Sequence, residues 1–331
     1  MRQNRLDRQL RIEGWNQQAL ENAKIGVVGD DDLLASLYIM SASALGINNV
    51  IVLAPVLNAI LVEAAQKINP RFALTHIEGF YSHPVIGELF QGCNLIADLS
   101  RYGLANKLLL EKRFSEKRPI IRGFCYENNG GQGFKVFTYM KGRDWQELEQ
   151  IVSPHNLPGS HFDDGVLDTI VTGIVLEETK NLLMGQDASD DLISYTRKQL
   201  NTSNDQPQIL VVGSGALGIF VGLGLAYSGF RQITFIDPDV VEVTNLNRQI
   251  FFYDAVGKSK AKTLSNKLNY LFEIESTFQV AYFDNNSDIS TYDVVFDCVD
   301  NFESRIVLSE KCLAHGKICL LYTSPSPRDR S

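Results

Sequence analysis

The sequence predicts an α/β protein made of two doubly wound domains in tandem. Short apolar runs, which suit buried parallel strands, alternate with segments of helical periodicity through most of the 331 residues. Two of these runs lead directly into a glycine turn, Ile25–Gly29 in the first half and Ile209–Gly213 in the second. Later strands also correspond, because Asp98 matches Asp297 in the same local pattern. The two halves are therefore predicted to be repeats of one fold.

The first repeat contains the elements of a complete domain, which we place at 1–185. The strands expected after its glycine turn are 50–54, 96–98, 119–124 and 131–139. A long helix is expected to follow at 165–185, because its apolar residues recur at helical spacing and Gly185 supplies a C-terminal cap. Residues 186–207 are polar and rich in breakers of regular structure, which predicts a linker.

The second repeat is placed at 208–318. Its expected strands are 209–212, 233–237 and 295–297. Counterparts of roughly 122–185 do not follow, so we expect this repeat to be truncated. Residues 319–331 match nothing in the first repeat, and their polar, proline-containing composition predicts a disordered tail.

The turn of the second repeat has the chemistry of a phosphate-binding loop. Gly213, Gly215 and Gly218 form a G-x-G-x-x-G pattern between a strand and a helix. The first glycine permits a sharp turn, the second lets backbone N–H groups approach a phosphate, and the third lets helix and strand pack closely. The next strand ends in Asp237, a carboxylate suited to ribose hydroxyls. This Rossmann-like arrangement serves either ATP or NAD.

The turn of the first repeat has lost these features. Asp31 and Leu34 stand where the second and third glycines would be, and an alanine or leucine, Ala54 or Leu53, replaces the acid that should end the next strand. Asp30 and Asp32 flank Asp31, so three carboxylates occupy the place that an anion would need. We therefore expect no nucleotide to bind in the first repeat.

Composition excludes several classes of function. A formal net charge of −8 disfavours nucleic acids and anionic membranes as partners. No segment approaches the roughly 20 apolar residues of a membrane span, and the first residues lack a secretory signal. The five cysteines form no C-x-x-C pair, so we expect neither a disulfide framework nor zinc, and we expect a cytoplasmic location.

Further polar residues follow Asp237 in a distinctive order. Asp239 comes first, then Asn245–Gln249, then Gly257–Lys260, and a later strand runs into Asp297–Arg305. This combination resembles the ThiF/MoeB superfamily of ubiquitin-like-protein activating enzymes. An inactive copy that precedes an active one is most similar to the adenylation region of ubiquitin-activating enzymes.

The resemblance covers about 1–185 and 208–318, including the opening segment Arg5–Leu20. It implies that the chain binds Mg·ATP and presents the α-phosphorus to the C-terminal carboxylate of a ubiquitin-like or sulfur-carrier protein. The products would be an acyl-adenylate and pyrophosphate. Positioning and charge neutralisation would supply most of the rate, because little covalent chemistry is asked of the protein.

The resemblance also implies roles for single residues. Asp237 would bind the ribose, and Asp300 would hold Mg²⁺, which prefers oxygen ligands. Arg248 would grip the triphosphate through its planar fork, and Lys260 would meet the α-phosphate as a point charge. The other nucleotide-binding residues would be Gly213, Gly215, Gly218, Asp239, Asn245, Gln249 and Asn301.

Arg8 is implied to act between repeats. In this family an N-terminal arginine of one subunit reaches the γ-phosphate bound to its neighbour, and Arg8 lies in the inactive repeat. We therefore expect the two repeats to form an intramolecular pseudo-dimer, in which the first completes the site of the second. Cys298 is expected to serve packing, and thioester chemistry is unsupported because the family's cysteine lies beyond the region present here.

Two other functions stay open from the residues alone. An NAD-dependent oxidoreductase would share the glycine turn and the acid, but it does not account for Arg248 and Lys260. A non-catalytic binding module would result if the truncation left the second repeat unable to close, with only the first repeat folded. If the chain is the adenylating enzyme, we expect the truncation to impair its activity.

Overall fold

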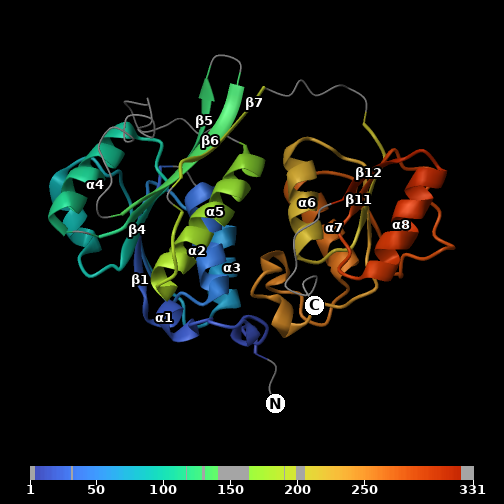
Figure 1. Cartoon of the computed structure of the whole chain (residues 1–331), viewed down its shortest axis with the longest axis horizontal. Helices are drawn as coiled ribbons and strands as arrows, with labels where there is room; N and C mark the ends of the chain where they lie inside the picture. The colour runs from blue at the N-terminus through green and yellow to red at the C-terminus, as the bar shows by residue number, and fades with distance from the viewer. Residues whose placement is uncertain are drawn as a thin grey trace. The chain divides into compact units, whose positions relative to one another are not determined.

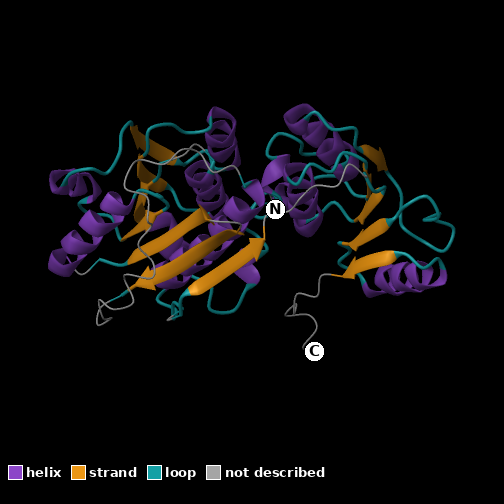
Figure 2. Cartoon of the chain, turned by 90° about the horizontal axis from the view of Figure 1, so that it is seen from above, coloured by secondary structure: helices purple, strands orange, loops and turns teal. Residues whose placement is uncertain are grey.

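The computed structural model describes residues 4–30, 33–116, 118–128, 131–140, 164–189, 191–198 and 206–321 (Figure 1). The chain divides into two compact units, Met1–Leu200 and Asn201–Ser331. Each unit contains a mainly or wholly parallel sheet of Rossmann-like type with helices packed against it (Figure 2). The predicted α/β fold class is therefore confirmed.

The first unit has a seven-stranded sheet in the order β3-β2-β1-β4-β5-β6-β7. The strands are β1 (Lys24–Val28), β2 (Asn49–Leu53), β3 (Ala73–Ile77), β4 (Leu95–Asp98), β5 (Ile120–Asn128), β6 (Gly131–Tyr139) and β7 (Ile193–Lys198). The pairs from β3 to β5 are parallel, whereas β6 and β7 join as antiparallel strands. Parallel pairing requires crossovers, and helices supply them here.

The helices of the first unit explain where its core lies. They are α1 (Gln17–Asn22), α2 (Leu34–Leu45), α3 (Ala59–Ile68), α4 (Gly103–Glu116) and α5 (Gly165–Met184), with the short 3-10 helices η1 (Gln9–Arg11) and η2 (Pro84–Phe90). Helix α5 packs against α2, β5 and β6. It ends, as predicted, at a left-handed Gly185 with φ of 71°. A second cluster, which includes the buried Phe90, Phe124 and Phe137, fills the space around β4, β5 and α4.

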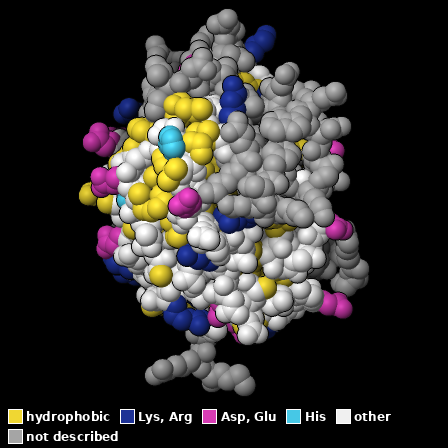
Figure 3. All heavy atoms as spheres, turned by 90° about the vertical axis from the view of Figure 1, so that its left-hand side faces the viewer, with side chains coloured by type: hydrophobic (Ala, Val, Ile, Leu, Met, Phe, Trp, Pro, Cys, Tyr) yellow, Lys and Arg dark blue, Asp and Glu magenta, His cyan; other side chains and the backbone are white. Residues whose placement is uncertain are grey.

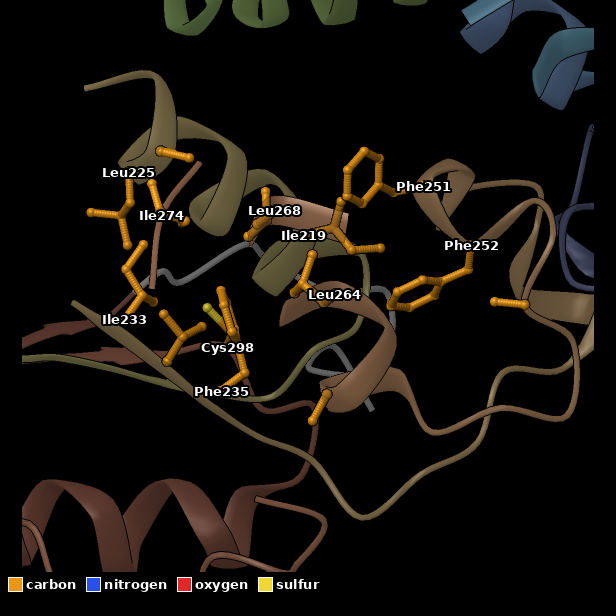
Figure 4. Close-up of a cluster of buried hydrophobic side chains, with 14 of the residues drawn as sticks. Ile219, Leu225, Ile233, Phe235, Phe251, Phe252, Leu264, Leu268, Ile274 and Cys298 are labelled. Atoms are coloured by element: carbon orange, nitrogen blue, oxygen red, sulfur yellow. The ribbon is translucent and has the colours of Figure 1, made fainter. Parts of the chain in front are cut away.

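The second unit has a five-stranded parallel sheet in the order β10-β9-β8-β11-β12. Its strands are β8 (Ile209–Val212), β9 (Ile233–Ile236), β10 (Thr277–Gln279), β11 (Val294–Asp297) and β12 (Ile318–Leu321). Its helices are α6 (Ala216–Tyr227), α7 (Lys260–Phe272) and α8 (Phe302–Ala314), with η4 (Val243–Asn245) and η5 (Ile250–Phe252). Figure 4 shows Ile219 of α6 and Leu264 and Leu268 of α7 in one buried cluster with Phe235 of β9.

The two sheets share their strand order. Strands β8 to β12 follow the same order in their sheet as β1 to β5 do in theirs. Gly29 N donates to Leu53 O in the first unit, and Gly213 N donates to Ile236 O in the second. The two units differ in the length of the segment that connects their second strand to the next long helix. This segment is 54–58 in the first unit and 237–259 in the second. The extra loop is where the additional polar residues of the second repeat lie.

Two expected boundaries differ in the structure. Residues 193–198 were expected in the linker 186–207, but they form β7, with Ile193 opposite Val136 of β6. An edge strand needs little apolar patterning, because backbone hydrogen bonds to one neighbour suffice. Residues 319–321 were expected in the tail, but they belong to β12, where Cys319 lies opposite Val295. The rest of that tail, 322–331, lies outside the described residues.

The surface of the first unit on the side of α4 shows hydrophobic and charged side chains next to one another (Figure 3). Val85 and Leu89 of η2 are among the exposed apolar residues of this unit. In the described part of the chain, no helix is both long and apolar enough to cross a membrane.

Candidate nucleotide site

The glycine turn joins β8 to α6, and two of its glycines are required by close contacts. Gly213 has a φ of 96°, and a Cβ added there would lie 2.5 Å from the carbonyl O of Cys298. A Cβ on Gly218 would overlap with the carbonyl O of Gly213. A side chain at either position would force the turn away from the neighbouring backbone. Gly215 differs, because it caps α6 and has more space around it.

Asp237 connects the glycine turn to the end of β9. Its Oδ2 accepts a hydrogen bond of 2.6 Å from the backbone N of Ser214, inside the turn. Its Oδ1 accepts one of 2.8 Å from the backbone N of Asp239. Burial raises the pKa of the Asp237 carboxyl, and the two backbone hydrogen bonds oppose that rise. The carboxylate is therefore fixed beside the turn.

The loop 237–259 places Asn245 and Gln249 in buried positions. Asn245 Oδ1 accepts a hydrogen bond of 2.9 Å from Glu242 N, which stabilises the short helix η4. Gln249 extends toward the glycine turn, since its Nε2 lies 3.6 Å from where a Cβ on Gly215 would be. The Oε1 of Gln249 is buried and has no hydrogen-bond partner among the described residues. A buried amide oxygen without a partner is costly, so it indicates a place for a donor.

Two of the predicted cations, Arg248 in this loop and Lys260 just after it, are held by oxygen atoms. Arg248 Nη1 donates to Thr244 O at 3.1 Å and to Asn247 Oδ1 at 3.0 Å. Lys260, the first residue of α7, forms an ion pair of 2.7 Å with Asp239 Oδ2. The Lys260 side chain is nearly buried, whereas that of Asp239 is 58% exposed. The ammonium group is therefore kept near the end of β9 by a carboxylate that is itself open to solvent.

The β11–α8 loop brings the last group of predicted residues to the same edge of the sheet. Cys298 N donates to Val212 O at 2.8 Å, so this loop leaves the sheet directly beside β8. Asn301 caps α8, since its Oδ1 accepts a hydrogen bond of 2.8 Å from Ser304 N. Asp300 is exposed, and no described residue hydrogen-bonds or ion-pairs with its side chain. The thiol of Cys298 is buried in the core, as predicted, and burial raises its pKa to about 12.

The structure therefore brings most of the predicted residues to the carboxyl ends of β8, β9 and β11, where open α/β sheets bind ligands. Arg8 lies elsewhere, in the first unit. It is the residue before η1, its side chain is exposed, and no described residue hydrogen-bonds with that side chain.

Two residues of this edge were not predicted from the sequence. Ser214 has a fully buried hydroxyl with no partner among the described residues. Its position between two glycines of the turn was a usable signal. Arg305 of α8 forms an ion pair of 3.2 Å with the buried Asp297. The motif that carries the resemblance runs from Asp297 to Arg305, but it assigns Arg305 no role, and the pairing itself depends on how α8 packs on β11.

The first unit has a different chemistry at the corresponding edge. Ala54 stands at the end of β2, and its backbone N donates to Ile77 O just as that of Asp237 donates to Gln279 O. Asp30 is buried and accepts a hydrogen bond of 2.6 Å from Arg101 N, so its carboxylate serves the protein's own backbone. Asp31 and Asp32 lie outside the described residues.

The donor set suits a magnesium ion only as a companion of phosphate groups. Among the described residues, no group of three or more His, Cys, Asp or Glu side chains could hold a metal by itself. Mg²⁺ commonly takes one or two carboxylates and completes its octahedron with water and substrate phosphates. The exposed carboxylate of Asp300 fits that arrangement.

Comparison with known proteins assigns the second unit to a family. Residues 188–324 match the ThiF family. The chain is 33% identical over 162 residues to the adenylyltransferase and sulfurtransferase MOCS3 of Drosophila sechellia, a match that covers 44% of this chain and 35% of that protein. It is 33% identical over 120 residues to the SUMO-activating enzyme subunit uba-2 of Caenorhabditis elegans, covering 34% and 20%. The matched segment thus spans about a third or less of these relatives' length.

Among solved structures, the tRNA N6-threonylcarbamoyladenosine dehydratase TcdA of E. coli in complex with ATP is 29% identical, with a TM-score of 0.32. That match covers 35% of this chain and 50% of TcdA. The match to the family, the parallel sheet and the glycine turn lie in one segment of the sequence. The second unit of this chain is therefore a ThiF-family domain.

Proposed function

We propose that this chain binds Mg·ATP in its second unit and adenylates the C-terminal carboxylate of a ubiquitin-like or sulfur-carrier protein. The observation that supports this most is the hydrogen bond of 2.6 Å between Ser214 N and Asp237, which fixes a ribose-binding acid beside a glycine turn. Two relatives that match this domain have names of adenylyltransferase or ubiquitin-like activating type. The reaction forms an acyl-adenylate and releases pyrophosphate.

The glycine turn offers two unsatisfied polar groups to a nucleotide. The Ser214 hydroxyl and the Gln249 amide oxygen are both buried and without partners among the described residues. The N-terminus of α6 adds backbone N–H groups, where the helix dipole favours negative charge. The Ser214 hydroxyl and these N–H groups can donate to the phosphates of a nucleotide, whereas the Gln249 oxygen can accept only from an N–H or O–H group of the nucleotide.

The residues that neutralise charge then have defined tasks. Arg248 would direct its guanidinium to the β- and γ-phosphates, with Asn245 and Gln249 beside it. Lys260 would exchange its ion pair with Asp239 for the α-phosphate, because that phosphorus gains negative charge on its oxygens as the carboxylate attacks. Asp237 would accept hydrogen bonds from the ribose and so fix the register of the whole nucleotide.

Asp300 would hold the magnesium ion, with Asn301 next to it at the start of α8. The ion would supply charge neutralisation on the phosphates, which makes pyrophosphate a better leaving group. The exposed position of Asp300 at the end of β11 supports this role, since the ion must be shared with a nucleotide.

We also propose that the first unit is a fused partner of the second, in an intramolecular pseudo-dimer. The shared strand order supports a tandem duplication of one domain. The segment that contains Arg8 is firmly held, since Gln9 Nε2 donates to Leu45 O at 2.9 Å and Arg5 Nη1 to Ala44 O at 2.5 Å. Arg8, exposed between these anchors, would supply a positive charge to the γ-phosphate.

An NAD-dependent reaction is the second candidate, and the loop 237–259 argues against it. Arg248 lies in that loop, and Lys260 follows it, paired with Asp239 at the end of β9. Two cations suit a triphosphate better than a nicotinamide and its diphosphate. We therefore prefer ATP.

The test compares nucleotides and then the reaction. The melting temperature of the full chain is measured with ATP and Mg²⁺, with NAD, and without ligand. A ligand at about 100 times its Kd adds roughly 2.7 kcal/mol to the free energy of unfolding. We expect ATP with Mg²⁺ to raise the melting temperature and NAD to leave it unchanged. Asp237→Ala should abolish the stabilisation by ATP, and Asp31→Ala in the first unit should not change it.

Carrier-dependent ATP–pyrophosphate exchange then tests the chemistry. Incubation with candidate carrier proteins should incorporate labelled pyrophosphate into ATP, and a carrier whose C-terminal carboxylate is blocked as an amide should not support it. Stabilisation by NAD rather than ATP would contradict the proposal. So would binding of ATP by a fragment that contains only the first unit.

A further inference from the structure

We propose that Arg305 is a positioning residue that holds the β11–α8 loop in the shape from which Asp300 reaches the magnesium ion of bound ATP. This inference rests on the proposed function, and it adds a residue to which no role in that site has yet been given. It rests on a ring of contacts that joins Arg305, Asp297 and Val299, just before Asp300.

Arg305 contacts both ends of the loop that precedes Asp300. Its Nε lies 3.2 Å from Asp297 Oδ2, at the end of β11. Its Nη2 donates to Val299 O at 2.8 Å. Val299 N in turn donates to Asp297 Oδ1 at 3.2 Å, which closes the ring. One guanidinium therefore fixes a buried carboxylate and the backbone immediately before Asp300.

The residues on either side of Asp300 are also fixed. Cys298 N donates to Val212 O, which ties the loop to β8. Asn301 caps α8 through Ser304 N. Asp300 is thus an exposed side chain on a backbone that is held before and after it. A ligand that coordinates a metal gains affinity when its orientation is fixed in this way.

The same loop supports the glycine turn. A Cβ on Gly213 would lie 2.5 Å from Cys298 O and 3.1 Å from Val299 N, so the two backbones are in close contact. Val299 therefore lies between the glycine turn and Asp300. Through Val299, Arg305 is connected both to the glycine turn and to Asp300, the proposed metal ligand.

The first unit contains an equivalent clamp with a different arginine. Arg122 of β5 forms an ion pair of 3.0 Å with Asp98 and donates to Ser100 O, the two positions that match Asp297 and Val299. In the second unit Leu321 occupies the strand position of Arg122, opposite Asp297. The arginine comes from helix α8 instead, although the two contacts are the same.

What differs is the residue that the clamp presents. The position of Asp300 is taken in the first unit by Arg101, which is buried. A clamp that served stability alone would require nothing of that position. In the second unit the clamped loop instead exposes a carboxylate at the edge where the glycine turn and Lys260 lie.

The experiment measures how magnesium changes nucleotide affinity in the full chain. Calorimetric titrations give the Kd of ATP over a series of MgCl₂ concentrations, and the Kd of AMP in EDTA. The key variant is Arg305→Lys, which keeps a positive charge but cannot contact Asp297 and Val299 O together. Lys311→Met is the matched control, since Lys311 is a cation of the same helix that donates to Ser287 O.

We expect Arg305→Lys to raise the MgCl₂ concentration needed for half-maximal tightening of ATP by roughly 10–100-fold, the usual effect of removing a partner that orients a metal ligand. The affinity for AMP in EDTA and the melting temperature should stay near those of Lys311→Met. In the background of Asp300→Ala, Arg305→Lys should have no further effect on the magnesium dependence, because the ligand that it positions is gone.

Three results would overturn the inference. One is an unchanged magnesium dependence in Arg305→Lys. Another is an equal loss of ATP and AMP affinity with a lower melting temperature, which would make Arg305 only a structural residue. The third is an additive effect with Asp300→Ala. Failure of the wild-type chain to bind ATP would instead contradict the proposed function, and the inference with it.

Discussion

Ala54 and Asp237 occupy the same backbone position in two units of one chain. Each ends the second strand of its sheet, and each donates its N–H to the third strand, Ala54 to Ile77 O and Asp237 to Gln279 O. Ala54 is buried and inert, whereas Asp237 holds the glycine turn through Ser214 N. The fold therefore does not depend on the residues of the proposed site.

The same comparison shows where the site was built. Strand order is the same for the five corresponding strands, but the connection after the second strand is 54–58 in the first unit and 237–259 in the second. The cations and amides of the proposed site lie in or next to that longer connection. A Rossmann-like scaffold thus persists while loops gain or lose chemistry.

The largest expected effect comes from giving the second unit the residue of the first at a glycine position. Leu34 is buried at the position that corresponds to Gly218. Gly218→Leu places a side chain against Gly213 O, so we expect the free energy of unfolding of the second unit to fall by more than about 4 kcal/mol.

The measurement uses the position of the tryptophans. The sequence has two tryptophans, of which Trp15 is half-buried in the first unit and Trp145 lies outside the described residues. Neither belongs to the second unit, so tryptophan fluorescence does not follow that unit, whereas circular dichroism follows both units. In Gly218→Leu, urea should remove part of the dichroism early and leave the fluorescence midpoint in place. A wild-type dichroism curve would show that the turn tolerates the side chain of the other repeat.

Next in size is the arginine clamp of the first unit. Arg122 and Asp98 are both fully buried, and Arg122→Leu would introduce the residue found at the corresponding position of β12. An uncompensated buried carboxylate costs about 3–5 kcal/mol. The fluorescence midpoint in urea should fall accordingly, and Asp98→Leu in the same chain should recover part of the loss. Equal stability of Arg122→Leu and wild type would show that the ion pair has no net effect.

A smaller effect is expected at Arg8, which tests whether the first unit contributes to the second. A hydrogen bond to a charged group contributes about 1.5–3 kcal/mol, so Arg8→Ala should weaken ATP by roughly that amount and leave AMP unchanged. Calorimetry with both nucleotides measures it. Arg11→Ala is the control, because Arg11 is an exposed arginine of the same segment that pairs with Asp7. Equal losses for ATP and AMP would make Arg8 an ordinary surface charge.

The smallest effect concerns pH. Burial raises the pKa of Asp237 above the ordinary value of 3.8. A raised pKa in the folded state stabilises the protein below the pKa of the unfolded chain, and this gain is lost as the pH rises through the folded pKa. The free energy of unfolding of the second unit should therefore fall as the pH rises from about 4, with a smaller slope in Asp237→Asn.

Asp297 leaves a residual slope in that variant, because burial raises its pKa too. The first unit, which has Ala54 at the position of Asp237, should lack this contribution, as fluorescence would show. An identical pH dependence in Asp237→Asn and wild type would mean that Asp237 does not titrate differently in the folded state.

The sequence predicted what depends on local pattern. Apolar runs located the parallel strands, and the glycines located the turn with its left-handed Gly213. Asp237 was placed at the end of β9 because a strand followed by an acid is a local signal. The order of these elements was enough to predict two α/β domains.

What the sequence could not predict depends on contacts between distant residues. The pairing of Lys260 with Asp239 and of Arg305 with Asp297 requires the packing of α7 and α8 on the sheet. The buried and unpartnered oxygen of Gln249 becomes visible only when burial is known. Strand β7 was missed because it is an edge strand. It pairs with β6 on one side, and most of its side chains are exposed, so its sequence has no clear apolar pattern.

Strand β7 determines when the first sheet is completed during synthesis of the chain. Strand β6 stays without its outer neighbour until residues 193–198 have been synthesised, so the first sheet is completed just before the second begins. A fragment that stops at residue 185 would leave the long edge of Gly131–Tyr139 open, and open edges of this kind lead to aggregation. Until residues 193–198 have left the ribosome, the nascent chain has this edge open, so protection by chaperones matters during that part of translation.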